Sequence, residues 1–178
     1  MKLKMILFVA AFFSLLAGSC SKKERHELAK KLPNTIVRVW NENAYFAFGA
    51  ETYQHSLQAA RINAMMHIAM HDAVNAVHPV YASYKFTGKD AAADPIAAAA
   101  SAAHTVLASV LPESKNFLDS CLAESLAEIK NGEKKNRGIE LGKQAAQAIL
   151  QDRANDGSEQ NPIVQIPVSN VPGVYQVV

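Results

Sequence analysis

The densest group of polar side chains in this sequence lies in residues 60–77, which read ARINAMMHIAMHDAVNAV. His67 and His71 are four residues apart, so a helix would place them on one face, with Asp72 next to them. Two imidazoles at this spacing can hold a divalent metal. The zinc-peptidase pattern requires a glutamate directly after the first histidine. Ile68 stands there, so we do not expect metalloprotease chemistry.

The same side chains also have a structural interpretation, in which they tie one long helix to its neighbours. Buried polar groups need hydrogen-bond partners, and methionines and alanines suited to a core surround these ones. On this interpretation Arg61 pairs with Asp72 or with a backbone carbonyl. We favour this buried network over the metal site, and we predict that His67 and His71 hold no metal.

Two further groups could suggest catalysis. His104, Asp119 and Ser114 offer the residue types of a hydrolase triad, but no sharp nucleophile turn frames the serine. Cys121 falls in an apolar helical stripe, and no histidine follows it in the sequence to activate it. We therefore interpret Cys121 as a packing residue and predict no catalytic residue here.

The first 19 residues have the layout of a secretory signal peptide. Lys2 and Lys4 precede an apolar run over residues 5–16, and small residues follow it up to Cys20. A retained transmembrane helix would need about 20 apolar residues, so this run is too short to span a bilayer. The sequence predicts an exported protein.

Residues 16–20, Leu-Ala-Gly-Ser-Cys, resemble a bacterial lipobox, in which the cysteine becomes an acylated N-terminus. Ala17 departs from the usual leucine-like residue, and the alternative is an ordinary signal with a cysteine near its cleavage site. Acyl chains contribute about 0.8 kcal/mol for each buried methylene. We predict lipidation at Cys20, which would anchor the protein to the inner or outer membrane, facing the periplasm or the cell surface.

The charge balance argues against a nucleic-acid partner. The chain has a formal net charge of +2 at pH 7, and removal of the signal would leave basic and acidic residues equal in number. Nucleic-acid binding depends on clustered basic residues that neutralise phosphates. The basic residues within 20–34 are instead interpreted as a tether next to the anchor. With Cys20 acylated, Cys121 would have no disulfide partner.

Helical spacing of apolar residues recurs between turn signals and predicts an all-α fold, a bundle of about five helices over residues 35–157. The first two helices cover about 35–48 and 55–77, and Pro79 ends the second. Asp94-Pro95 opens an alanine-rich third helix. The fourth follows Pro112 and ends at 131–132, and the fifth covers about 133–155. Prolines make the tail, residues 158–178, irregular.

Several of these passages, in this order, resemble the N-terminal helical region of vanadium-dependent haloperoxidases and their type 2 phosphatidic acid phosphatase relatives. They are Val39-Trp40-Asn41, residues 61–79 with Tyr81 and Tyr84, the alanine-rich third helix, Gly142 with residues 151–157, and the Pro-Gly-Val-Tyr stretch at 172–175. The resemblance covers nearly the whole chain after the signal. The motifs that carry it belong to the structural scaffold of that family.

The resemblance implies an all-helical protein with one site for vanadate or phosphate. That site carries the signature Lys-x6-Arg-Pro, Pro-Ser-Gly-His and Ser-Arg-x5-His-x3-Asp, in which cationic groups neutralise the oxyanion and histidines act on its central atom. Lys130 and Arg137 match the first half of the first motif, but Gly138 follows, and the other motifs are absent. We interpret this pair as a solvated charged turn, and we expect no catalytic, cofactor-binding or metal-binding residue in this chain.

The leading hypothesis is the N-terminal scaffold portion of a membrane-anchored haloperoxidase-like or acid-phosphatase-like protein. On this hypothesis the chain is inactive as it stands, and residues 158–178 begin a missing catalytic half that would bind vanadate or phosphate. The helices would pack against that half or against a second copy. Phosphatase and haloperoxidase activities in the intact relative remain alternatives. Two other hypotheses are a self-contained helical lipoprotein acting as a binding or structural module, and a small metalloprotein using His67 and His71.

Overall fold

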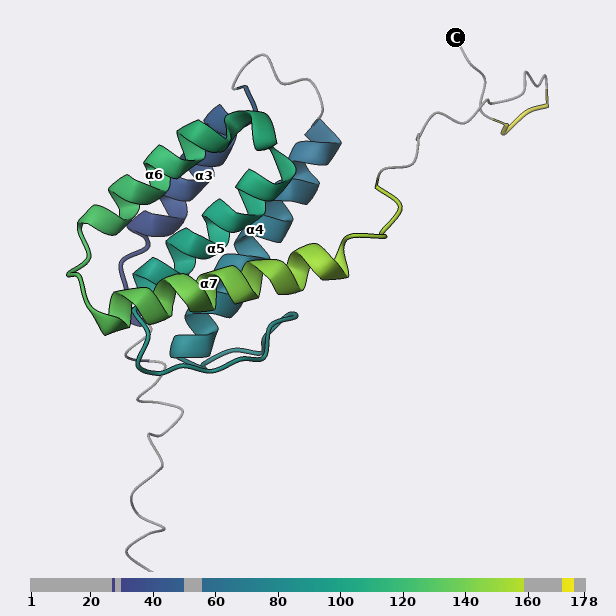
Figure 1. Cartoon of the computed structure of the whole chain (residues 1–178). Helices are drawn as coiled ribbons and strands as arrows, with labels where there is room; N and C mark the ends of the chain where they lie inside the picture. The colour runs from purple at the N-terminus through teal and green to yellow at the C-terminus, as the bar shows by residue number, and fades with distance from the viewer. Residues whose placement is uncertain (1–26, 28–29, 50–55, 159–170, 175–178) are drawn as a thin grey trace, which may run out of the picture.

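The computed structural model describes residues 27, 30–49, 56–158 and 171–174. Within these ranges the chain forms five α-helices and one short 3-10 turn, with no strand (Figure 1). They are α3 (Thr35–Ala47), α4 (Ser56–Val77), α5 (Pro95–Val110), η2 (Pro112–Ser114), α6 (Lys115–Ala127) and α7 (Glu133–Asp152). The all-α prediction is therefore confirmed.

Helix α5 lies at the centre of the bundle and contacts the other four helices (Figure 1). Asp94 caps its N-terminus, because Oδ1 accepts hydrogen bonds from the amides of Ile96 at 2.9 Å and Ala97 at 2.8 Å. Pro95 occupies the first helical position, where a missing amide hydrogen breaks no intrahelical bond. Every residue from 97 to 103 is buried, so the alanine-rich run is the middle of the core.

Helix α7 packs closely across α5 because it presents glycines there (Figure 1). A Cβ atom on Gly142 would lie 2.2 Å from the carbonyl oxygen of Ala98, and one on Gly138 would lie 2.4 Å from that of Asp94. Real Cβ atoms do not approach backbone oxygens this closely. The small residues of α7 therefore set the distance between the two helices.

Large side chains fill the rest of the core between α5 and the outer helices. Trp40 of α3, Leu107 of α5, Leu118 of α6 and Ile149 of α7 are almost completely buried. Cys121 of α6 is also buried, and desolvation by burial raises the pKa of its thiol. A raised pKa disfavours the thiolate that a nucleophile requires, which agrees with a packing role.

The helix boundaries differ from the sequence predictions by a few residues. Helix α6 ends at Ala127, before the predicted stop at 131–132, and α7 ends at Asp152, ahead of the predicted 155. The predicted signal peptide, Cys20, most of the tether and most of the tail lie outside the described residues. Within the described ranges, no helix is both long enough and apolar enough to cross a membrane.

Candidate functional site

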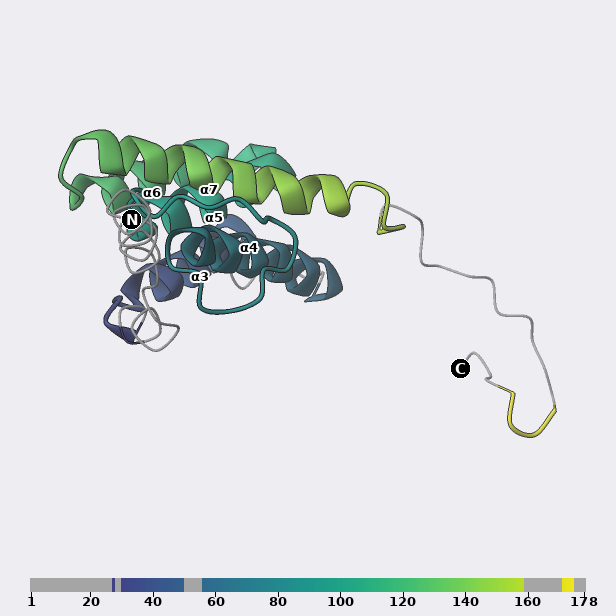
Figure 2. The same ribbon diagram turned by 90° about the horizontal axis from the view of Figure 1, so that it is seen from below.

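The C-terminal half of α4 organises the loop that follows it, residues 78–94. The carboxylate of Asp72 is 1% exposed and accepts three backbone hydrogen bonds from this loop. Oδ1 accepts from the amide of Tyr84 at 2.7 Å, and Oδ2 accepts from the amides of Lys85 at 2.7 Å and Phe86 at 2.8 Å. Figures 1 and 2 both show the teal loop lying across the C-terminal end of α4.

Asn75, one helical turn after Asp72, holds the first part of the same loop. Its Oδ1 accepts from the amides of Val80 at 3.0 Å and Tyr81 at 2.9 Å. Its Nδ2 donates to the carbonyl of Tyr81 at 2.9 Å and to Ser83 Oγ at 3.2 Å. Sequence reasoning did not single out Asn75. The available signal was an asparagine three residues before the His-Pro pair that follows the helix.

The two histidines of the stretch each reach a neighbouring oxygen. His67 Nε2 lies 3.3 Å from Asn41 Oδ1 on α3, and His71 Nε2 lies 3.1 Å from the carbonyl oxygen of Ala82 in the loop. Partial burial lowers the pKa of His67. Within the ranges that the structure describes, no three His, Cys, Asp or Glu side chains converge as a metal site would require.

Arg61, at the other end of α4, does not pair with Asp72. It donates from Nε to Asp156 Oδ2 at 3.0 Å and from Nη2 to the carbonyl of Arg153 at 3.0 Å, so of the two partners considered, the backbone carbonyl is the one observed. Hydrogen bonds from Arg61 and Ser158 lower the pKa of Asp156. Arg61 thus fixes the turn that follows α7 against α4.

Two more contacts join this turn to the loop. Arg153 donates to the hydroxyl of Tyr84, and Lys85 forms an ion pair with Asp152. Tyr84 and Lys85 are also the residues whose amides bind Asp72. One short loop segment therefore connects the C-terminal half of α4 with the C-terminal end of α7.

The nominal hydrolase triad does not form. His104 Nε2 lies 2.8 Å from Asp119 Oδ1, and Lys115 Nζ lies 2.6 Å from Asp119 Oδ2. Hydrogen bonds from Lys115 and then His104 lower the pKa of Asp119. Ser114 instead donates its hydroxyl hydrogen to the carbonyl of Ala47 at 2.9 Å. With the serine hydrogen-bonded to α3, no activated nucleophile results.

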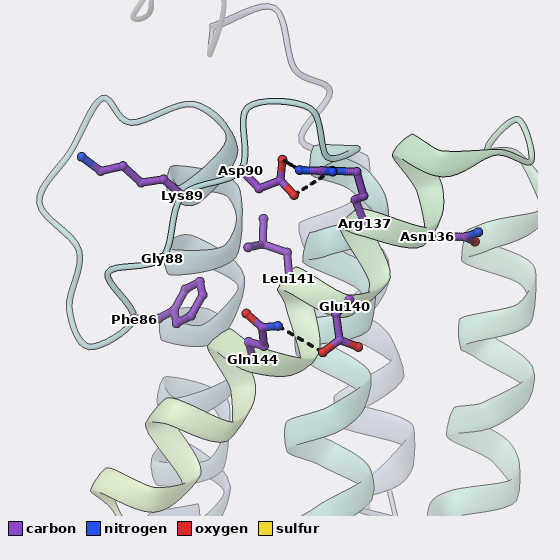
Figure 3. Close-up of a pocket in the computed structure, with 9 residues that line it drawn as sticks. All are labelled: Phe86, Gly88, Lys89, Asp90, Asn136, Arg137, Glu140, Leu141 and Gln144. Atoms are coloured by element: carbon purple, nitrogen blue, oxygen red, sulfur yellow. Dashed lines mark hydrogen bonds and ion pairs between the residues drawn. The ribbon is translucent and has the colours of Figure 1, made fainter.

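Arg137 forms a bidentate ion pair with Asp90 at the end of the loop (Figure 3). Its Nε lies 2.9 Å from Asp90 Oδ2 and its Nη2 lies 2.8 Å from Asp90 Oδ1, while Glu133 lies 3.5 Å from Nη1. The hydrogen bonds raise the pKa of Arg137 and lower that of Asp90. Arg137 and Lys130 are both exposed, and Arg137 is in addition paired with Asp90.

The Asp90–Arg137 pair borders an open groove of about 580 Å³ between the loop and α7 (Figure 3). Phe86 and Leu141 supply apolar surface, and Glu140 accepts a hydrogen bond from Gln144 at 3.1 Å. The side chain of Lys89 extends away from the other labelled side chains (Figure 3). Lys130 does not line this groove, so the two residues that resemble the first half of the oxyanion signature do not converge there.

Comparisons with known proteins identify no relative: no protein-family model, no curated protein and no solved structure matches this chain. The resemblance to haloperoxidases and phosphatases therefore rests on the sequence passages quoted above.

Proposed function

We propose that the helical domain, residues 35–157, is a structural scaffold: the N-terminal portion of a membrane-anchored protein of the haloperoxidase or acid-phosphatase kind. In this proposal the domain supplies a framework and carries out no chemistry by itself. The observation that supports it most strongly is the use of Asp72 as the acceptor of three loop amides.

A buried carboxylate with three amide partners is poorly suited to catalysis. Its acceptor sites are occupied, and at 1% exposure the group has almost no contact with solvent or substrate. Asn75 uses both its amide oxygen and its amide nitrogen on the loop, and Arg61 is bonded to the turn after α7. The polar residues that most suggested chemistry thus hold three parts of the fold together.

Oxyanion chemistry also lacks support among the described residues. A phosphate or vanadate site needs convergent cations and amides whose charge is not already neutralised. Arg137 is bound to Asp90 and Arg61 to Asp156, and each partner carboxylate would repel an anion. We therefore propose that this chain is inactive by itself, and that any vanadate or phosphate bound by an intact relative is held by other segments.

Activity assays and vanadate binding test this proposal. We expect no bound signal in ⁵¹V NMR, no hydrolysis of p-nitrophenyl phosphate and no peroxide-dependent bromide oxidation above buffer. Elemental analysis should find no stoichiometric metal. Turnover that survives both Lys130→Ala and Arg137→Ala would reveal a different catalytic site. Zinc or iron that is lost in His67→Ala would support the metalloprotein hypothesis instead.

A second test separates a scaffold from a self-contained lipoprotein module. Leu57 is 86% exposed and Phe46 is 53% exposed on the described surface, and exposed apolar groups that gather into a patch commonly mark an uncovered interface. A scaffold that normally packs against another domain or copy should bind a hydrophobic dye and self-associate in size-exclusion chromatography. A monodisperse monomer that binds no dye would favour the self-contained module.

A further inference from the structure

A second cavity, of about 310 Å³, has no role in the proposed scaffold function. It is formed by α3, the C-terminal half of α4, the start of the following loop and α5. Its lining is mainly apolar and includes three imidazoles: Val37, His67, Met70, His71, Val74, Asn75, His78, Tyr81 and Ala99. The histidines share one stripe of α4 and its C-terminal extension.

The existing hydrogen bonds determine which nitrogen of two imidazoles carries the hydrogen. His71 Nε2 faces the carbonyl oxygen of Ala82, and His67 Nε2 faces the side-chain oxygen of Asn41. Both oxygens can only accept, so each Nε2 must donate. In a neutral imidazole Nδ1 is then an acceptor, and no hydrogen bond to either Nδ1 occurs within the described part of the chain. Partial burial lowers the pKa of His67, which favours this neutral form.

The lining also limits the charge of a ligand. No Lys, Arg, Asp or Glu lines the cavity, so no ionic group is present to bind an ion. Val37, Met70 and Val74 favour an apolar body, while the ring of Tyr81 lies 6.1 Å from that of His71 and can flank a flat molecule. The volume is at the lower end of the range of about 300–1,000 Å³ for small-molecule sites.

We propose that this cavity binds a small neutral aromatic molecule that carries one hydrogen-bond donor, of the phenol class. The ring contacts the apolar walls, and the hydroxyl donates to Nδ1 of His67 or His71. This site is independent of the scaffold function, and either proposal can fail without the other.

The test titrates the full chain with 4-methylphenol and with 4-methylanisole, which keeps the ring and methyl group but lacks the donor. Ring ¹⁵N spectra of the histidines report the contact directly. We expect 4-methylphenol to move the Nδ1 resonance of His67 or His71 towards its protonated value. One net hydrogen bond predicts binding about five- to tenfold tighter than that of 4-methylanisole. Unchanged histidine resonances at millimolar 4-methylphenol, or equal affinity for the two probes, would overturn the proposal.

Two valines of α3 provide matched variants. Val37 lines this cavity and is 39% exposed, whereas Val39 is 37% exposed and lines a different cavity, next to Cys121. We expect Val37→Phe to fill the site and weaken 4-methylphenol binding at least about tenfold, and Val39→Phe to leave the affinity within about twofold. Equal loss in both variants would contradict the location. If Val37→Phe does not fold, the pair of probes decides alone.

Discussion

Replacement of Asp72 by alanine should destabilise the fold more than any other single carboxylate substitution on α4, α5 or the loop between them. The change removes the acceptor of the Tyr84, Lys85 and Phe86 amides, at 2.7, 2.7 and 2.8 Å. It also leaves a small void where a buried carboxylate had been. The loop would lose its attachment to the C-terminal half of α4, while the helical core of α5 and α7 would stay packed.

The magnitude follows from the kind of hydrogen bond involved. Each bond to a charged acceptor contributes about 1.5–3 kcal/mol, so three would contribute about 4.5–9 kcal/mol if they were additive. The loop can open, and water can then solvate the freed amides, so we expect a loss of about 3–5 kcal/mol in the free energy of unfolding. Domains of this size have about 5–15 kcal/mol in total. Asp72→Ala should therefore remove between about a fifth and all of the stability of the domain.

Urea unfolding followed by far-ultraviolet circular dichroism measures this loss. The matched control is Asp94→Ala, which removes an N-cap carboxylate that accepts two amides, and which should cost about 1 kcal/mol. If Asp72→Ala is no more destabilising than Asp94→Ala, the three amide bonds do not contribute as we argue.

The other predictions concern packing, pH and anchoring. Gly142→Ala should lower stability by about 1–3 kcal/mol in thermal unfolding, because its Cβ would lie 2.2 Å from a backbone oxygen of α5 and this clash outweighs the gain of about 1 kcal/mol in helix propensity; a stabilised variant would refute the close packing. The lowered pKa of Asp156 means that its ion pair with Arg61 stabilises the fold above the unfolded pKa of about 3.9 and is lost as the pH falls towards the lower folded pKa. The free energy of unfolding of Asp156→Asn should accordingly fall less steeply below pH 4 than that of the wild type. An equal pH dependence in the two proteins would argue against the ion pair. Mass spectrometry of the membrane fraction should find Cys20 acylated and N-terminal, and Cys20→Ala should release the protein, whereas unchanged membrane association would exclude the anchor.

The helices could be predicted from the sequence because their signals are local. Asp94-Pro95 specifies a capped start with little dependence on the rest of the chain, and the apolar stripe around Cys121 determines which face of α6 is buried. The positions at which the helices end were less predictable. Whether the last turn of a helix forms depends on whether tertiary contacts stabilise it. Helix α7 ends at Asp152, and Arg61 donates a hydrogen bond to the carbonyl oxygen of the next residue, Arg153.

The partners of the polar residues could not be predicted, because they depend on an irregular loop. A carboxylate such as Asp72 can accept from an arginine or from amides, and the sequence does not say which lies within reach. The amides that it binds lie 12–14 residues away in a segment without periodicity. Asp90 and Arg137 are 47 residues apart in the sequence. Their pairing could not be predicted without knowing how α7 packs against the loop.

The most direct test of the central claim, that α4 uses its polar side chains to hold the loop, is amide hydrogen exchange of residues 84–86 in the full chain. The side chains of Tyr84 and Lys85 are exposed, so without Asp72 their amides should exchange rapidly. The account predicts slow exchange at all three positions in the wild type, and loss of that protection in Asp72→Ala while α5 amides such as that of Ala100 stay protected. Wild-type exchange at residues 84–86 as fast as that of Lys89 in the same loop would contradict it.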